Sequence, residues 1–370
     1  MNNKKLALWV VFSLIALILL GYIGYLFKPK AKNNANIGRQ GILGRPLKVG
    51  ILSWPGYVGG LVANNGFKPN KDCIYFKDYN LLVEFSLVED VDVKTKLLLG
   101  GGNDNLDIVY TTVDFWANES PNILKGGIST KAFLQVDWSK GADAIVVDSS
   151  INTVEELANH KIALTSLSPS HWFYEYIMAH SSITDKQLSD LEKNIVGKNS
   201  SPDARQDFVA NRVDACVVWE PDVSIALKDR KGSKVLISTL DHRELLADLM
   251  VTRDDFIKEH PDALQAFVNG WFAGVKDAKA NPQNAANLLI KGEPFFSALG
   301  QEKTLSILNE VNLTELPENV KMFGVDDSPP IFDKLFREAG QIWLKRGFIT
   351  DTLTPTKVAT NQFIKPLFIK

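Results

Sequence analysis

The chain has little of what marks several common classes of protein. Its 370 residues include only two cysteines, so disulfides cannot form its framework and the core must come from buried apolar side chains. The 25 glycines and 16 prolines are ordinary numbers, which excludes a collagen-like or low-complexity chain. A hydrophobic fraction of 45% excludes a disordered chain. No basic excess or run of like charges indicates a nucleic-acid surface, so no nucleic-acid partner is expected.

The motifs of familiar catalytic and metal sites are also missing. The five histidines are scattered, with no H-E-x-x-H motif and no cysteine at zinc-binding spacing. There is no G-x-S-x-G motif, and the run Gly100 to Gly102 lacks the Lys and Ser or Thr of a phosphate-binding loop. We therefore predict a binding protein and not an enzyme, with no cofactor and no metal. Cys73 in a polar loop and Cys216 in an apolar strand are predicted to be free thiols.

One long uncharged segment stands near the start of the chain. Residues 6–27 carry no charge, and a helix of this length would span about 33 Å, enough to cross a bilayer. Bulky aromatics close the segment where a signal peptide would have a small-residue cleavage site. We predict an N-terminal transmembrane helix within residues 1–27, followed by a polar tether at residues 28–45. A cleaved signal peptide is the alternative.

The remainder of the chain alternates apolar strands with helices. The strands are predicted at residues 47–51, 81–87, 106–110, 144–147, 161–164, 213–219, 235–237 and 249–251. Helices are predicted at residues 93–99 and 169–178, and residues after 252 read mostly as helix. Such alternation indicates an α/β fold with parallel or mixed sheets covered on both faces, and two such runs suggest two lobes. Ligands of open α/β sheets bind beyond the carboxyl ends of the strands.

Five sequence blocks follow one another in a familiar order: GRPLKVGILSWPGYVGGLVANNGFKPN, DIVYTTVD, SLSPSHWFYEYI, VDACVVWEPD and VTRDDFIKEHPDALQAFVNGW. Over roughly residues 45–280 the chain resembles the substrate-binding proteins of ABC importers in the nitrate, sulfonate and taurine group. The resemblance is greatest to a branch with a W-P-G-Y or W-P-G-F loop, some of whose members are fused to an OmpA-like domain and loosely associated with phosphate.

The resemblance implies a two-lobed periplasmic-binding-protein fold of type II. Residues 46–136 and 246–370 would form lobe 1, and residues 137–245 lobe 2. The protein would lie on the extracytoplasmic face of the inner membrane, held there by residues 6–27. It would close on a small anionic ligand, similar to nitrate, a sulfonate or taurine, and deliver it to permease and ATPase subunits.

Nine residues near strand ends are the candidate ligand contacts. They are Trp54, Tyr57, Thr111, Thr112, Asp137, Ser168, Ser170, His171 and Glu220. The two aromatics would stack on the ligand, and the two threonines would supply hydroxyl groups. Residues 168–171 begin a helix, whose N–H groups can bind an anion. Glu220 would bind an amine or hydroxyl or hold the lobes together, and Asp137 marks a crossover between lobes. Burial in a core, helix capping or a surface turn is the alternative role in each case.

Two other functions stay open at this point. One is a sensor or assembly protein on the same fold, and the other is an enzyme similar to the thiamine-pyrimidine synthases, whose Cys-rich motif this chain lacks. The charge distribution bears on the ligand. The first 45 residues hold seven of the 41 basic residues and no acid, so the remaining chain has 34 basic against 43 acidic residues, a net charge of −9. An anion would be repelled at long range and would depend on local donors, which leaves a zwitterion or cation open.

Overall fold

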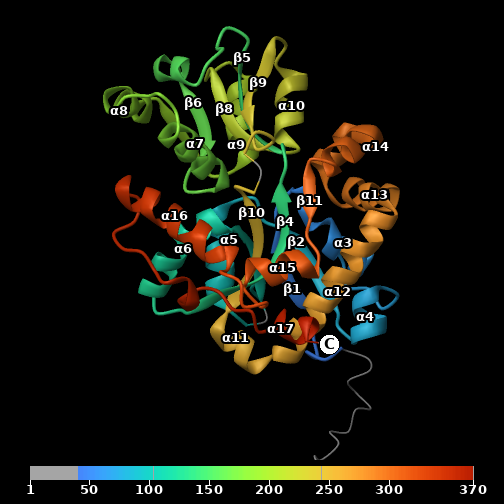
Figure 1. Cartoon of the computed structure of the whole chain (residues 1–370). Helices are drawn as coiled ribbons and strands as arrows, with labels where there is room; N and C mark the ends of the chain where they lie inside the picture. Colours follow the sequence, from blue (N-terminus) through green and yellow to red (C-terminus); the bar gives the residue numbers. More distant parts are fainter. Residues whose placement is uncertain (1–40, 103, 243, 370) are drawn as a thin grey trace, which may run out of the picture. The chain divides into compact units, whose positions relative to one another are not determined.

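The computed structural model describes residues 41–102, 104–242 and 244–369 (Figure 1). The membrane segment predicted within residues 1–27, and the predicted tether as far as residue 40, lie outside the described residues. Among the helices that are described, none is both long and apolar enough to span a bilayer. The described chain builds two β-sheets, each surrounded by helices.

The larger sheet has six strands in the order β11-β4-β10-β3-β1-β2. These are β1 (Leu47–Ile51), β2 (Val83–Leu87), β3 (Ile108–Thr112), β4 (Thr130–Ser139), β10 (Ala247–Arg253) and β11 (Val311–Leu313). Strand β1 runs parallel to β2 and β3, whereas β10 pairs antiparallel with β3 and β4. The carboxyl ends of β1 and β3 therefore lie at one edge of the sheet, where the Trp54 loop begins.

The helices associated with this sheet come from both ends of the described chain. They are η1 (Pro55–Tyr57), α3 (Val58–Asn64), α4 (Ile74–Tyr79), α5 (Val91–Gly100), α6 (Val113–Lys125), α11 (Asp254–Glu259), α12 (Pro261–Ala280), α13 (Pro282–Gly292), α14 (Pro294–Leu308), α15 (Leu316–Met322), α16 (Ile331–Lys345), η3 (Pro355–Lys357) and α17 (Lys365–Phe368). The mostly helical character predicted after residue 252 is confirmed. We call the six-stranded sheet with these helices the first lobe.

The smaller sheet has five strands in the order β7-β6-β8-β5-β9. These are β5 (Asp143–Asp148), β6 (Ile162–Thr165), β7 (Ile195–Lys198), β8 (Ala215–Trp219) and β9 (Ser233–Ser238). Its helices are η2 (Glu155–Asn159), α7 (Pro169–Ala179), α8 (Asp185–Lys193), α9 (Ser201–Val209) and α10 (Asp222–Asp229). We call this sheet with its helices the second lobe.

Both faces of the smaller sheet are buried. Along β5, Ile145 and Val147 belong to the main core, which also contains Trp172 of α7. The intervening residues of the strand, Ala144 and Val146, belong to a second apolar cluster with side chains of α9 and α10. This alternation follows from the two-residue period of a strand and explains why its sequence is apolar throughout.

The chain passes between the lobes twice, from β4 to β5 and from β9 to β10 (Figure 1). The two passages contact each other, since the hydroxyl oxygens of Ser139 and Thr239 are 2.7 Å apart. Thr239 Oγ1 also accepts a hydrogen bond of 2.8 Å from the N–H of Gly141, whose φ of +114° suits glycine. The α/β fold with two lobes is thus confirmed.

The longest strand, β4, was not predicted from the sequence. It contains polar residues such as Gln135 and Asp137, yet nearly all of it is buried. The strand lies between β10 and β11 inside the sheet, and its polar side chains Gln135 and Asp137 meet protein and not solvent. Periodicity alone therefore gave no strand signal there. The short strands β7 and β11 were missed as well.

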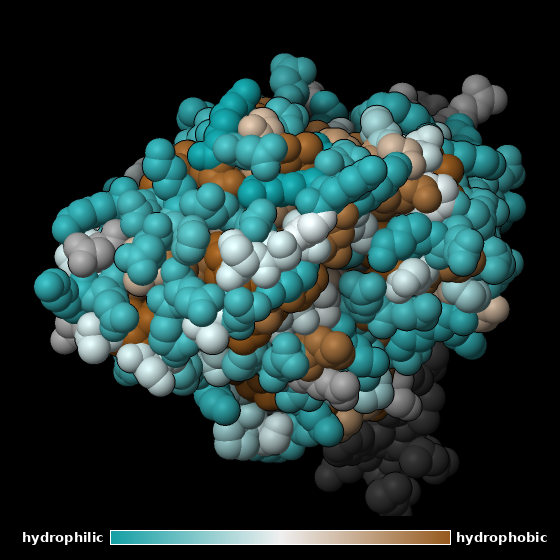
Figure 2. Space-filling model, turned by 90° about the horizontal axis from the view of Figure 1, so that it is seen from above, coloured by the Kyte–Doolittle hydropathy of each residue, from teal (hydrophilic) through white to brown (hydrophobic). Residues whose placement is uncertain are grey.

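The exposed surface carries few large apolar side chains. The face seen from above is mainly hydrophilic, with hydrophobic residues in narrow strips (Figure 2). The exposed large apolar residues are Val93, Leu124, Leu167, Val235, Leu240, Leu344, Phe348, Phe368 and Ile369. Most are scattered singly along the chain, as is ordinary for a protein surface.

Candidate functional site

The loop after β1 is fixed against the neighbouring strand β4. Trp54 is extended, Pro55 opens the short helix η1, and the indole Nε1 of Trp54 donates a hydrogen bond of 2.8 Å to Asp137 Oδ2. Gly56 makes this contact possible, because a Cβ at that position would lie 1.5 Å from Asp137 Oδ2. The W-P-G-Y sequence thus fixes the orientation of the Trp54 ring.

A second aspartate lies beside the first. Asp248 of β10 pairs with Asp137 of β4 across the sheet, and Asp248 Oδ1 accepts a hydrogen bond of 2.8 Å from the Tyr57 hydroxyl. Burial raises the pKa of Asp137 to about 7. Burial, followed by the nearby charge of Asp137, raises the pKa of Asp248 well above its usual range. The two aspartates therefore resist carrying two negative charges at once.

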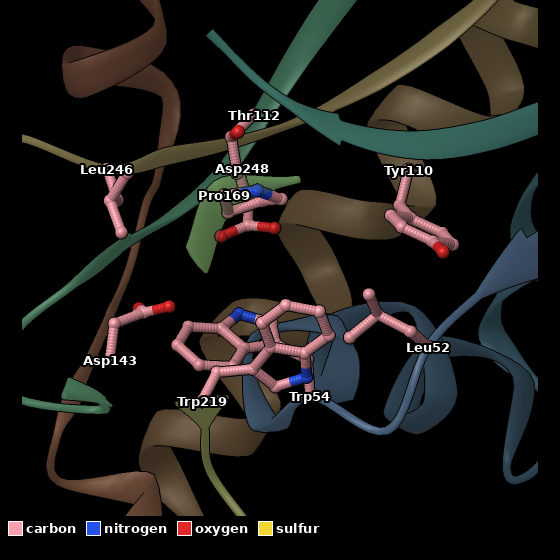
Figure 3. Close-up of a pocket in the computed structure, with 9 residues that line it drawn as sticks. All are labelled: Leu52, Trp54, Tyr110, Thr112, Asp143, Pro169, Trp219, Leu246 and Asp248. Carbon is pink, nitrogen blue, oxygen red and sulfur yellow. The ribbon is translucent and has the colours of Figure 1, made fainter. Parts of the chain in front are cut away.

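A small void lies between the lobes next to these aspartates (Figure 3). Its lining residues are Leu52, Trp54, Tyr110, Thr112, Asp143, Pro169, Trp219, Leu246 and Asp248. Only about 20 Å³ of the void admits the centre of a water-sized sphere, room for about one water molecule. The lobes therefore fit closely around it.

The polar and aromatic groups lie on different sides of this void. Figure 3 shows the rings of Trp54 and Trp219 together on one side, with the carboxyl groups of Asp143 and Asp248 directed towards the space over them. Trp54 comes from the first lobe and Trp219 from the end of β8 in the second. Both rings are buried, with 3% of their surface exposed. The site is thus assembled by both lobes.

The electrostatics of the site are acidic. Burial, together with the nearby charges of Asp248 and Glu220, raises the pKa of Asp143 to about 8, against a hydrogen bond from Ser139 that lowers it. Among the described residues, no Lys, Arg or His forms an ion pair with Asp137, Asp143 or Asp248. In the empty protein the raised pKa values of Asp143 and Asp248 favour their protonated form near neutral pH, whereas a positive charge beside them would favour the ionised form.

The predicted site residues are distributed unevenly around the void. Trp54 and Thr112 line it. Asp137 and Tyr57 do not, but each is hydrogen-bonded to a lining residue, Asp137 to Trp54 and Tyr57 to Asp248. Thr112 also caps α6, and its hydroxyl donates to Asp114 Oδ2 at 3.0 Å. Thr111 is turned elsewhere, since its hydroxyl donates to Glu119 Oε2 at 2.9 Å.

The residues predicted at the start of α7 have structural partners. Ser168 is the N-cap: its oxygen accepts from the His171 N–H, and its hydroxyl donates to the carbonyl of Thr165 at 2.7 Å. The His171 ring faces α16, where it lies 5.4 Å from the ring of Trp343. Ser170 is buried beside the lining residue Pro169, and its hydroxyl has no partner. Of this predicted anion site, only Pro169 lines the void.

Glu220 follows β8 and serves the next helix. Its Oε1 accepts a hydrogen bond of 2.5 Å from the Ser224 hydroxyl, and its Oε2 accepts one of 3.1 Å from the Ser224 N–H. Burial raises the pKa of Glu220 to about 7. The Glu220 side chain does not line the void, and its hydrogen bonds stabilise the first turn of α10.

Three important lining residues are absent from the nine candidates: Asp143, Trp219 and Asp248. Each has a signal in the sequence. Asp143 directly precedes the apolar run of β5, and Asp248 stands inside the apolar segment 245–251. A buried carboxylate is costly unless a partner pairs with it, so a carboxylate within an otherwise apolar strand indicates a specific interaction. The two cysteines are free and buried, as predicted.

Comparisons with known proteins agree with this fold. Residues 142–285 match the family described as NMT1/THI5 like. The chain is 25% identical over 209 residues to the taurine-binding periplasmic protein of Escherichia coli (strain K12), over 50% of this chain and 62% of that protein. The alignment therefore spans less than two thirds of the relative.

Solved structures extend the likeness over more of the chain. The periplasmic aliphatic sulphonate binding protein SsuA from Escherichia coli is 17% identical, with a TM-score of 0.63 over 86% of this chain and 98% of that one. The alkanesulfonate-binding protein SsuA from Xanthomonas axonopodis pv. citri, bound to MOPS, is 14% identical, with a TM-score of 0.64 over 85% and 98%. The match of residues 142–285 to the NMT1/THI5-like family model agrees with the predicted resemblance, and the two lobes have the fold of periplasmic sulfonate-binding proteins.

Proposed function

We propose that this protein is the solute-binding component of an ABC importer and that it holds a small solute between its lobes. The observation that carries the proposal is the void at the strand ends, which residues of both sheets line together. The taurine- and sulfonate-binding relatives support the same role. The protein performs no covalent chemistry: it binds, closes, and releases the solute to a membrane permease that an ATPase subunit drives.

Binding requires the lobes to move apart and together. The void has room for about one water molecule, so a larger solute cannot enter until the lobes separate. The hinge consists of the two passages at residues 139–143 and 238–247, where Gly141 and Thr239 meet. The moving bodies are residues 46–136 with 246–370, and residues 137–245, with β4 extending into the hinge.

The N-terminal segment fits this role. Residues 6–27 serve as an uncleaved membrane anchor, and the polar residues after them form a tether to the soluble body. The body then lies on the extracytoplasmic face of the cytoplasmic membrane, in the periplasm if the cell has one. A tether of this kind keeps the binding protein close to its permease.

The experiment uses the full-length protein in detergent. We expect gentle denaturation to release one small solute, identified by mass spectrometry, and the refolded protein to bind it again. Trp54→Ala should weaken this binding at least tenfold, about 1.4 kcal/mol, because it removes one wall of the void. Leu124→Ser, at an exposed position of α6 away from the void and the hinge, is the control and should bind like the natural protein.

Two results would contradict the proposal. A protein that releases no solute and binds none from a cell extract is not a binding component. Equal affinities for the natural protein and Trp54→Ala would place the solute somewhere other than this void. N-terminal sequencing of the exported protein tests the anchor separately, because cleavage would give a start near residue 28.

A further inference from the structure

We infer that the solute carries a positively charged ammonium group, which lies against Trp54 and Trp219 and faces the carboxyl groups of Asp143 and Asp248. This inference rests on the proposed function and specifies the chemical class of the solute. It departs from the anionic ligand that the resemblance to nitrate- and sulfonate-binding proteins implies. Four features of the void support it.

The first feature is uncompensated acid. Asp143 and Asp248 are 4% and 8% exposed, and Asp137 beside them is fully buried. The charged groups that act on them are themselves carboxylates: Asp143 feels Asp248 and Glu220, and Asp248 feels Asp137. Some other buried acids in this chain do have a basic partner, as Glu175 has Arg346. A cation in the void would lower the pKa values of these carboxyl groups and pair with their ionised form.

The second feature is the aromatic wall. Trp54, Trp219 and Tyr110 all line the void, and an indole face attracts a cation more strongly than the other aromatic rings do. The ring of Trp54 is held in place by its hydrogen bond to Asp137. A carboxylate on one side and an aromatic face on the other suit an ammonium group. Both of these groups would repel an anion.

The chain already holds one buried ammonium in this manner. Lys94 Nζ lies 2.6 Å from Glu119 Oε1, 5.1 Å from the ring centre of Tyr110 and 5.0 Å from that of Phe115. Its side chain is 1% exposed. The same combination of one carboxylate and aromatic faces therefore accommodates a desolvated ammonium within this fold.

The third feature is the lack of basic side chains to pair with an anion. Pro169, the first residue of α7 and part of the lining, has no N–H, and the N–H of His171 donates to Ser168. No Lys, Arg or His is among the lining residues. A metal cation is a poor alternative, since the described residues include no group of three or more His, Cys, Asp or Glu that could hold one.

The fourth feature points to a ligand with a second, weakly polar end. The indole Nε1 of Trp219, a lining residue, is buried and has no hydrogen-bond partner among the described residues. The Ser170 hydroxyl, next to the lining residue Pro169, is also buried and without a partner there. Unpaired buried donors of this kind are costly unless a ligand pairs with them. An acceptor atom on the solute, a few bonds from its ammonium group, would satisfy them.

A matched pair of probes tests the ammonium group. Taurine and isethionate share the same ethanesulfonate, but taurine has an ammonium group where isethionate has a hydroxyl. Tetramethylammonium is a cation with no acidic end. Calorimetric titration of full-length protein should show that taurine or tetramethylammonium binds at least tenfold more tightly than isethionate.

Variants assign that preference to the void. Asp143→Asn and Trp219→Ala should each abolish at least nine tenths of the affinity for the ammonium probe. Trp219→Phe, which keeps an aromatic face, should retain more affinity than Trp219→Ala and guards against a folding defect. Asp207→Asn removes a carboxylate that is paired with Lys198 and Arg212 in the second lobe, and it should leave binding unchanged.

The outcomes separate this inference from the proposed function. If isethionate binds as tightly as taurine, or if Asp143→Asn strengthens binding, the ammonium inference is wrong while a solute-binding function stands. If none of the three probes binds, the solute released by denaturation decides: an amine or quaternary ammonium compound supports the inference, and a solute with no positive charge overturns it. If the protein neither binds a probe nor releases a solute, the proposed function itself fails.

Discussion

Single residues at the void combine structural and binding roles. Gly56 lets Asp137 approach Trp54, and Asp248 receives the Tyr57 hydroxyl, so the aromatic wall and the acidic side of the void are joined by hydrogen bonds. Burial of these acids costs free energy in the empty protein. That cost can be measured through its dependence on pH.

Asp143 gives the most direct pH prediction. Its pKa is raised to about 8, so the folded protein keeps a proton that the unfolded chain releases near pH 4. The free energy of unfolding should therefore fall as the pH rises from about 4 to 8, by about 1.4 kcal/mol per pH unit for each retained proton. Asp137 and Glu220, with pKa values of about 7, add to this dependence.

Thermal unfolding of the solute-free protein between pH 5 and 9 tests this prediction. Asp143→Asn should show a shallower fall in Tm than the natural protein. Asp207→Asn is the matched control: the pKa of Asp207 is lowered by its hydrogen bonds with Lys198 and Arg212, so its carboxylate stays ionised in this range. Parallel profiles for the natural protein and Asp143→Asn would show that Asp143 keeps no proton.

The lining residues that are absent from the nine candidates could not be assigned to the void for one physical reason. The Trp54 loop could be predicted because proline, glycine and a strand end occur together in the sequence. Asp143 and Asp248 belong to strands of different sheets, and only the packing of the two lobes brings them to one void. Nothing local tells whether a buried aspartate faces a core or the opposite lobe.

At the scale of elements, the start of helix α7 could be predicted, but the contacts of its side chains could not. The sequence predicted its start, and Ser168 does cap it. The side on which His171 lies depends on α16, more than 150 residues further along the chain. The ring of Trp343 in α16 packs against His171 and Trp172 at 5.4 and 5.8 Å. Periodicity within α7 cannot reveal this partner.

The contact between α7 and α16 joins the two lobes. Arg346, which ends α16, donates from Nε to Glu175 Oε2 of α7 at 2.7 Å, and it also pairs with Glu192. The helix α16 is fixed to the first lobe, since Trp343 Nε1 donates to the carbonyl of Asp114 at 2.9 Å. These contacts stabilise the arrangement in which the lobes are together.

Arg346→Gln should therefore favour separation of the lobes. It leaves Glu175, which is 2% exposed, without its cationic partner, and we expect affinity for the solute to fall at least fivefold. Arg337→Gln is the control on the same helix, because Arg337 is exposed and pairs only at 3.9 Å, with Asp333. Calorimetric titration that gives equal affinities for the two variants would show that this contact does not stabilise closure.

At the scale of the whole molecule, the two-lobed fold could be predicted from alternating strands and helices together with the five sequence blocks. The sequence did not reveal how closely the lobes fit, because that depends on side chains contributed by both. It is this fit that makes lobe motion necessary for binding. Motion of the lobes on solute binding is therefore the central claim.

The most direct test is the distance between spin labels on the two lobes. Val93 in α5 and Val235 in β9 are both exposed, so Val93→Cys and Val235→Cys accept labels, whereas the native Cys73 and Cys216 are buried. Pulsed electron paramagnetic resonance on the full-length protein should give a broad distribution of label-to-label distances without solute. With solute bound, the distribution should be narrower and shifted. A distribution that stays the same while calorimetry shows the solute bound would contradict closure of the lobes around it.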